Sequence, residues 1–423
     1  MKINSKIALK HNWFTYVTFF VIIQFEGNDL MKILSVNAGS SSLKFTLFEM
    51  PEEKVIVSGT FEKIGLNSSI YTIKYNGEKI KKECVLNTHK DAVNVLMEEL
   101  LNLNIIKSYD EIEGVGHRVV QGADKYSKSV IIDEEVCKDI VKFTPLAPIH
   151  NPANLIGIES FKEVLKDVKQ VGVFDTAFHQ TMKESEYLYP LPLEWKEKYG
   201  VRKYGFHGTS HRFISETMKE YLKKDAKIIS CHIGNGASLS AIKDGACVDT
   251  SMGFTPLAGL MMGTRSGDID ASIVPYLCDK LNLSASEIIN KFNKESGLLA
   301  ITGVSSDLRD VESEYLNGNE RCKLGLEMYS RKIVNYISMY NTLLDGAEYI
   351  VFTAGVGENS PIVRGLVCEK LKALGVEIDK NLNEEMFGKF GEISSNNSKI
   401  KVFVVPTNEE LMIARDTYDL IKE

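Results

Sequence analysis

Three short segments rich in glycine and serine each follow an apolar stretch typical of a β-strand. They are residues 37–44 (NAGSSSLK), 232–236 (HIGNG) and 354–360 (AGVGENS). Such segments let the backbone approach an anion closely and offer it amide and hydroxyl donors. A single one is usually an ordinary polar turn. Three of them in one chain, the first ending in Lys44, predict a binding site for a polyphosphate.

The two most common nucleotide-binding motifs do not occur in the sequence. No GxxxxGK[ST] segment is present, and GVGENS at 355–360 has serine where the dinucleotide motif needs glycine or alanine. We therefore exclude P-loop and Rossmann sites, and we expect a nucleotide held by several separate turns.

Candidate residues for phosphoryl transfer lie in other short motifs. Arg118 lies in a GHRVV segment, Arg265 in GTRSG and His207 in GFHG. A guanidinium group can hold a carboxylate through two hydrogen bonds, or neutralise the charge that spreads over a transferring phosphoryl group. The glycines beside His207 leave its imidazole accessible, although a purely structural histidine is the alternative. These residue types favour a kinase mechanism.

The apolar pattern predicts an α/β fold that begins with several strands. The predicted strands are 32–37, 43–48, 55–61, 71–75, 114–120 and 170–175, and the predicted helices are 91–103, 134–143 and 154–164. The opening strand also recurs, because KILSVN at 32–37 resembles KIISCH at 227–232, and both precede a small-residue turn. Chance similarity is the alternative. The repeat predicts two related domains that face a shared ligand across a cleft.

The composition is that of a globular chain with room for two domains: 423 residues, 44% hydrophobic and 25% charged. A net charge of -7 gives no general attraction to nucleic acid, so we expect no nucleic-acid partner. The seven cysteines include no CxxC pair and are expected to be reduced thiols of a cytoplasmic protein.

Residues 1–30 differ from the rest of the chain. Three lysines precede an apolar run at 13–25, which is short for a membrane span and is not followed by a small-residue cleavage site. We expect this segment to be a mis-assigned start or a dispensable extension, without stable membrane association. A targeting or interfacial segment is the alternative.

Further motifs carry a resemblance to a known family. They are LAPIHNP (146–152), FDTAFH (174–179), YGFHGTSH (204–211), MGFTPL (252–257), MGTRSG (262–267), FTAGVGEN (352–359) and PTNEE (406–410). With the segments above, they resemble the acetate kinases, within the acetate and sugar kinase, heat-shock protein and actin superfamily. One departure is QGA at 121–123, where the family commonly has HGG beside the substrate pocket.

The resemblance implies two duplicated ribonuclease-H-like domains, of the actin-like ATPase type, with the active-site cleft between them. The N-terminal domain would comprise residues 31–180 and be completed by a helix at 408–423. Residues 181–407 would form the nucleotide-binding domain and the interface of a homodimer. The implied reaction is reversible transfer of the γ-phosphoryl group of ATP to acetate, giving ADP and acetyl phosphate for acetyl-CoA biosynthesis.

The resemblance also assigns roles to individual residues. It implies Mg²⁺, for which Mn²⁺ can substitute, near Asn37 and Glu409. The acceptor carboxylate would bind Arg118, with Val120, Ile149 and Pro256 beside the acceptor carbon. Catalysis would rest on Asp175, His207 and Arg265. ATP would contact Ser40, Ser42, Lys44, His232, Ile233, Gly234, Asn235, Gly236, Asp307, Leu308, Arg309, Gly355, Val356, Gly357, Glu358 and Asn359.

Asp175 follows the apolar segment 171–174, a position from which an acidic residue reaches into an α/β cleft. A carboxylate acceptor is ionised at neutral pH, since carboxyl groups titrate near 4, and so needs no base. We hypothesise that Asp175 positions Mg²⁺-bound water or Arg265. A kinase that acts on an alcohol would instead require it as a base.

Other functions remain as alternatives. A propionate or other short-chain carboxylate kinase differs only in the room beside the acceptor carbon. A sugar kinase fits less well, because Val120, Ile149 and Pro256 offer a sugar few polar groups. A non-catalytic ATP-binding module would not need both Arg118 and Arg265.

Overall fold

The computed structural model describes residues 30–66 and 68–422, so the predicted N-terminal extension lies, apart from Leu30, outside the described residues. The strands are β1 (Met31–Gly39), β2 (Ser42–Met50), β3 (Lys54–Glu62), β4 (Ser69–Tyr75), β5 (Glu78–Cys84), β6 (Ile112–Val119), β7 (Val130–Ile131), β8 (Lys169–Phe174), β9 (Lys227–Ile233), β10 (Ala237–Lys243), β11 (Ala246–Thr250), β12 (Tyr349–Thr353), β13 (Gly391–Glu392) and β14 (Lys401–Val404).

The helices are α1 (His89–Asn102), α2 (Glu134–Lys142), α3 (Asn151–Val164), α4 (Glu184–Tyr187), α5 (Leu193–Tyr199), α6 (Gly208–Leu222), α7 (Ile273–Leu281), α8 (Ala285–Lys294), α9 (Gly297–Thr302), α10 (Leu308–Leu316), α11 (Glu320–Leu343), α12 (Ala354–Asn359), α13 (Pro361–Lys370), α14 (Lys380–Glu385) and α15 (Glu409–Ile421). Short 3-10 turns are η1 (Tyr109–Glu111), η2 (Thr144–Leu146), η3 (Ala177–Thr181) and η4 (Lys372–Leu374). Within the described residues, no helix combines the length and the apolar character needed to cross a bilayer.

Six strands of the first sheet have the same topology as the six strands of the second, and the first sheet has β4 and β5 in addition. The first has the strand order β5-β4-β3-β2-β1-β6-β8-β7, and the second β11-β10-β9-β12-β14-β13. In each sheet, three consecutive antiparallel strands are extended by two strands that run parallel to the first of the three. The similar segments 32–37 and 227–232 lie in β1 and β9, which occupy the same place in their sheets. The predicted α/β fold with a duplicated domain is confirmed.

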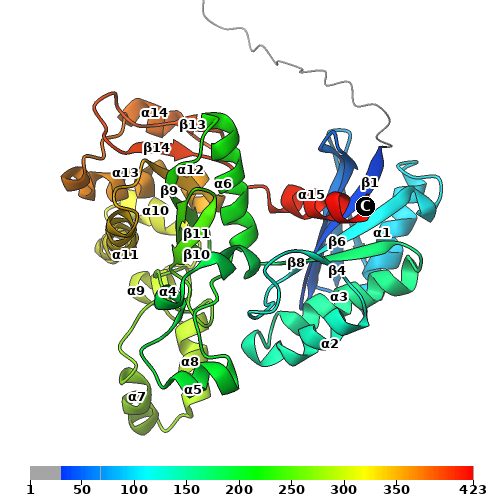
Figure 1. The fold of residues 1–423 in the computed structure, drawn as a ribbon, viewed down its shortest axis with the longest axis horizontal. Helices are drawn as coiled ribbons and strands as arrows, with labels where there is room; N and C mark the ends of the chain where they lie inside the picture. Colours follow the sequence, from blue (N-terminus) through cyan, green and yellow to red (C-terminus); the bar gives the residue numbers. More distant parts are fainter. Residues whose placement is uncertain (1–29, 67, 423) are drawn as a thin grey trace, which may run out of the picture.

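The C-terminal helix α15 packs on the first sheet, although it follows the last strand of the second (Figure 1). Its residues Leu411 and Tyr418 share a hydrophobic cluster with Ile33 of β1. A Cβ on Gly116 of β6 would lie 2.2 Å from Thr417 Oγ1, so this contact requires glycine in the GHRVV motif. The packing agrees with a C-terminal helix that completes the first domain, while the domain boundaries stay a prediction.

The elements that differ from the expected ones include β5 and the segment 354–359. β5 (EKIKKEC) was not predicted, because it is an edge strand of mostly exposed, charged residues without apolar alternation. Residues 354–359 were expected as a glycine-rich turn, but they form the short helix α12 directly after β12. The glycines of this segment therefore lie at the start of a helix.

Candidate active site

An ion pair at one edge of the first sheet joins three predicted site residues. Arg118 Nε lies 3.1 Å from both carboxylate oxygens of Asp175, and Arg118 Nη2 lies 2.6 Å from Oδ2. Arg118 Nη1 lies 3.4 Å from Asn37 Oδ1. The three side chains meet because β1, β6 and β8 are parallel neighbours and present their ends at one edge. Asp175 is buried, whereas the Arg118 side chain stays 23% exposed to solvent.

The first turn of α15 adds two carboxylates to this edge. Burial raises the pKa of Glu409 to about 7; Arg118 opposes the rise and the Asp175 carboxylate adds to it. Glu410 forms an ion pair with Lys44, the lysine of the first glycine-rich hairpin. A buried carboxylate that is costly to ionise is stabilised by a cation. The oxygen donors of Asn37 and Glu409 therefore fit the predicted Mg²⁺ site.

His207 and Arg265, both in the second domain, lie close to the turn at Gly236. A Cβ on Gly236 would lie 3.5 Å from Arg265 Nη1 and 3.6 Å from His207 Nε2. His207 is the N-cap of α6 and has φ 56°, a left-handed conformation that is uncommon outside glycine and often found at functional sites. Its pKa is held well below the ordinary value, chiefly by burial and also by neighbouring charges that include Arg118 and Arg265. The imidazole is therefore neutral at neutral pH.

A cavity of about 590 Å³ opens in the second domain beside this point. The predicted nucleotide-binding residues that line it are Gly234, Asn235, Asp307, Leu308, Arg309, Gly355, Val356 and Asn359. They come from the turn between β9 and β10, the start of α10, and α12. Three segments that are distant in the sequence thus meet in one cavity, as expected for a nucleotide held by separate turns.

The other predicted nucleotide residues lie outside the lining of this cavity. Among them, Ile233 is fully buried in the core, and Glu358 accepts a hydrogen bond from the Thr407 amide at 3.1 Å. His232 and Gly236 belong to the β9–β10 hairpin, and Gly357 lies in α12. Ser40, Ser42 and Lys44 are exposed on the β1–β2 hairpin of the first domain. A ligand that contacts both the β1–β2 hairpin and the cavity residues therefore has to contact both domains.

The residues predicted beside the acceptor carbon are placed differently from one another. Val120 is buried, whereas Ile149 is 61% exposed. The Pro256 carbonyl accepts a hydrogen bond from Arg265 Nη1 at 3.0 Å. The pKa of His150, next to Ile149, is lowered by burial and by Arg118 and Arg265. The loop that carries Ile149 therefore lies close to both arginines.

The hypothesis for Asp175 needs one correction. The Asp175 carboxylate is bonded to Arg118, whereas Arg265 donates to the Pro256 carbonyl. In the structure Asp175 is therefore paired with Arg118 and not with Arg265, while a role in positioning Mg²⁺-bound water stays a prediction. The sequence could not distinguish the two arginines, because the choice depends on which strands are adjacent in the sheet.

Six further lining residues were not named individually as nucleotide-binding residues, although Gly263 lies in the MGTRSG motif and Ser360 in the segment 354–360. They are Gly263, Leu298, Ser306, Glu312, Tyr329 and Ser360. The Ser360 hydroxyl donates to the Glu312 carboxylate, and burial raises the pKa of Glu312. Glu312 and Tyr329 lie on helices α10 and α11, and neither belongs to a glycine-rich motif. The only available signal was the position of Glu312, shortly after the segment 307–309.

Buried neutral histidines should make the fold sensitive to acid. Burial lowers the pKa of His117 to about 4, of His179 to about 4 and of His232 to about 3. Below about pH 6.5 these histidines bind protons in the unfolded chain but stay unprotonated in the folded chain. The free energy of unfolding should therefore fall as the pH drops from 6.5 toward 4, by up to about 1.4 kcal/mol per pH unit for each histidine.

Urea unfolding at several pH values measures this effect. His117→Gln should reduce the slope of the free energy of unfolding against pH by close to the amount that corresponds to one proton. This holds whatever its effect on the stability at neutral pH. An unchanged slope in this variant would mean that His117 titrates alike in the folded and unfolded chain.

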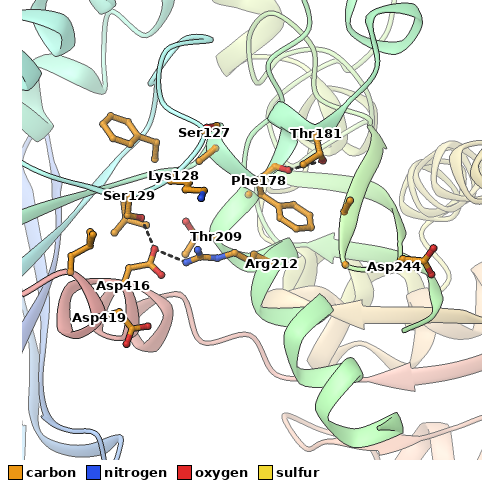
Figure 2. A pocket seen from close by; sticks show the side chains of 17 residues that line it. Ser127, Lys128, Ser129, Phe178, Thr181, Thr209, Arg212, Asp244, Asp416 and Asp419 are labelled. Carbon is orange, nitrogen blue, oxygen red and sulfur yellow. Dashed lines mark hydrogen bonds and ion pairs between the residues drawn. The ribbon is translucent and has the colours of Figure 1, made fainter. Parts of the chain in front are cut away.

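A second cavity, of about 580 Å³, lies at the junction of the two domains. Figure 2 shows that Asp416 of α15 accepts hydrogen bonds from Ser129 and from Arg212 of α6, the latter at 2.7 Å. None of the predicted site residues lines it. It is therefore separate from the candidate active site.

Comparisons with known proteins give consistent matches over most of the chain. The acetokinase family matches residues 32–415. The acetate kinase of Geobacillus kaustophilus (strain HTA426) is 52% identical over 394 residues, 92% of this chain and 99% of that protein. The crystal structure of Porphyromonas gingivalis acetate kinase matches with a TM-score of 0.88 and 46% identity, over 92% of this chain and all of that one. A propionate kinase structure from Francisella tularensis subsp. tularensis SCHU S4 also gives 0.88, at 40% identity over 92% of this chain and all of that one.

Proposed function

The chain belongs to the acetokinase family, and we propose that it catalyses reversible transfer of the γ-phosphoryl group of ATP to acetate, giving ADP and acetyl phosphate. The observation that carries this proposal is the convergence of two cationic side chains and a neutral imidazole beside the nucleotide-sized cavity. Arg118 belongs to the first domain, and Arg265 and His207 belong to the second; both arginines lie close enough to His207 to lower its pKa.

The reaction follows from this arrangement. Nucleoside and phosphates occupy the cavity and the cleft, and acetate binds at the free edge of the Arg118 guanidinium. A carboxylate oxygen forms a bond to the γ-phosphorus while the bond from that phosphorus to the bridging oxygen of ADP breaks. Arg265 and His207 donate hydrogen bonds to the transferring oxygens, where negative charge accumulates. No proton has to leave the acceptor.

We propose Asn37 and Glu409 as protein ligands of Mg²⁺, with Mn²⁺ as a substitute. Mg²⁺ is commonly held by one or two protein oxygen ligands together with substrate phosphates. When bound, the metal ion neutralises phosphate charge and orients the nucleotide. In the part of the chain that the structure describes, no three His, Cys, Asp or Glu side chains form a closed metal site, a geometry that Mg²⁺ does not need.

Hydroxylamine trapping of acyl phosphate tests the reaction directly. With ATP and Mg²⁺, acetate should give acyl hydroxamate with the highest kcat/KM among acetate, propionate, butyrate and glycerol. The similarity to a propionate kinase makes propionate the second candidate. A higher kcat/KM for propionate would establish that alternative, and ATP turnover with glycerol alone would refute a carboxylate kinase.

The assignment of the 590 Å³ cavity to the nucleotide predicts the effect of a bulky residue at Gly355. A Cβ there would meet no atom within 4 Å, and Gly355 lines the cavity, so we expect a larger side chain to fit the fold and to occupy cavity space. Gly355→Leu should raise the Kd for ATP at least about tenfold and leave the melting temperature nearly unchanged. Calorimetric titration with ATP and thermal unfolding measure both quantities.

Gly365 on α13 supplies a matched control for this substitution. It is also a helical glycine with open space, because the nearest atom to its Cβ position is Asn383 Nδ2 at 4.0 Å. It does not line the nucleotide cavity. Gly365→Leu should therefore leave the affinity for ATP unaffected. Equal losses of affinity in the two variants would disprove the assignment.

We also propose a cytoplasmic homodimer. All seven cysteines lie in described parts of the chain and are free, which suits a reducing compartment. Helices α5 and α7 both lie toward one end of the second domain (Figure 1), and each carries exposed apolar side chains. They are Leu193, Trp195, Tyr199, Ile273, Tyr276 and Leu281. Exposed apolar side chains of this size support an interface between two copies of this domain.

A further inference from the structure

A chain of hydrogen bonds runs from His207 into the core of the second domain. His207 Nδ1 lies 2.9 Å from Ser238 Oγ, and the same oxygen lies 2.8 Å from His211 Nε2. His211 Nδ1 in turn lies 2.9 Å from Ser230 Oγ. Ser238, His211 and Ser230 are all fully buried. None of the roles assigned above uses these three residues.

This series of hydrogen bonds arises from the way that α6 lies on β9 and β10. Ser238 of β10 pairs with His232 of β9, and Ser240 pairs with Ser230. Their neighbours Cys231 and Leu239 point to the opposite face of the sheet, into the main core. The polar residues thus face α6, whose first turns carry His207 and His211. A buried polar seam of this kind is stable only when every member is hydrogen-bonded.

The seam has two directions of hydrogen bonding in which the Ser238 hydroxyl also donates; if Ser238 accepted from both rings, its own proton would have no partner among the described residues. Burial is the main reason that the pKa of His207 and of His211 lies well below the ordinary value, so each ring carries one proton. Ser238 has one proton and two nitrogen partners. If it donates to His207 Nδ1, it accepts from His211 Nε2, and Ser230 must donate to His211 Nδ1. In the reverse direction, every one of these bonds is inverted.

Only the first direction leaves a proton on His207 Nε2. That nitrogen faces the turn at Gly236, beside Arg265. Phosphoryl oxygens are acceptors, so an unprotonated Nε2 would repel them, whereas Nε2–H donates to them. A change in the direction of the buried chain would therefore reverse the hydrogen-bonding role of His207.

We propose that Ser238 and His211 are positioning residues that hold His207 as the tautomer protonated on Nε2, with Ser230 fixing the far end of the chain. The inference rests on the proposed phosphoryl transfer, because that reaction gives His207 Nε2 its acceptor. Ser238 and His211 act through His207 and do not touch the substrate.

Nitrogen NMR of enzyme labelled with ¹⁵N-histidine tests the tautomer without an activity assay. Signals of His207 are assigned by their absence in His207→Gln. We expect Nε2 of His207 to be protonated and Nδ1 to be unprotonated in the wild-type enzyme. A proton on Nδ1 would overturn the proposal, whether or not any variant folds. If the enzyme shows the expected tautomer but does not phosphorylate acetate, the proposed function is refuted and the positioning proposal is not.

Ser238→Ala tests the consequence for catalysis. Without the serine proton the two tautomers should both be populated, and kcat should fall about 10- to 100-fold while the KM values for acetate and ATP stay within about twofold. Ser240→Ala is the matched control, because Ser240 is equally buried on the same strand and bonds to Cys247 and the Asp249 carbonyl instead. It should change neither tautomer nor kcat. An unchanged tautomer or an unchanged kcat in Ser238→Ala would refute the positioning role.

Discussion

Replacement of Arg265 by alanine is expected to lower kcat by about a thousandfold or more, with little change in the KM for acetate. Burial alone lowers the pKa of Arg265, and within residues 30–66 and 68–422 no carboxylate lies within 4.0 Å of its guanidinium. An unpaired, partly buried cation in a cleft favours an anionic ligand. An arginine that meets the transferring phosphoryl group contributes about 10³- to 10⁵-fold to kcat.

Two further variants separate charge and geometry in this experiment. Arg265→Lys keeps the charge but loses the planar pair of donors, so its kcat should lie between those of wild type and Arg265→Ala. Arg331→Ala removes an exposed arginine on α11 and should leave both constants unchanged. Steady-state kinetics at saturating ATP gives kcat and KM for each. If Arg265→Ala mainly raised the KM for acetate, Arg265 would bind the ground state and not the transition state.

The sequence predicted the duplicated fold because local patterns repeat in it. KILSVN and KIISCH carry the same alternation of apolar residues, and each forms the central strand of its sheet. The edge strand β5 escaped prediction, because its charged residues lack a buried face to impose alternation. The helix α15 could be placed on the first sheet only by resemblance, since the contact of Gly116 with Thr417 joins residues that are 301 positions apart.

The candidate site was predicted to the extent that its residues lie in short motifs. Glycine-rich turns and flanked arginines are visible in one dimension, so Arg118, Arg265 and the turn at 234–236 could be singled out. The partner of each side chain depends on which strands and helices are neighbours. For that reason the pairing of Asp175 with Arg118, and the buried chain behind His207, needed the structure.

The role of Asp175 now has a sharper expected signature. The carboxylate is nearly fully buried and makes its hydrogen bonds to Arg118, which also faces Asn37 and the charge of Glu409. Removing one partner of a buried ion pair leaves the other charge uncompensated. Asp175→Asn should therefore loosen Arg118, raising the KM for acetate and lowering kcat by about 100-fold or more. The altered charge beside Asn37 and Glu409 should also raise the Mg²⁺ concentration needed for half-maximal rate.

Asp249→Asn is the matched control for Asp175→Asn. Asp249 is also a buried carboxylate, but it pairs with Lys203 and contacts none of the proposed site residues. Both variants should lose some stability, and only Asp175→Asn should change the KM for acetate and the Mg²⁺ requirement.

Measurements of kcat against pH at two Mg²⁺ concentrations complete the test. An obligate base would instead lose the acidic limb of the kcat profile and keep its Mg²⁺ dependence, because its contribution depends on taking up a proton. An acetate acceptor has no proton to give, so we expect the acidic limb to persist in Asp175→Asn.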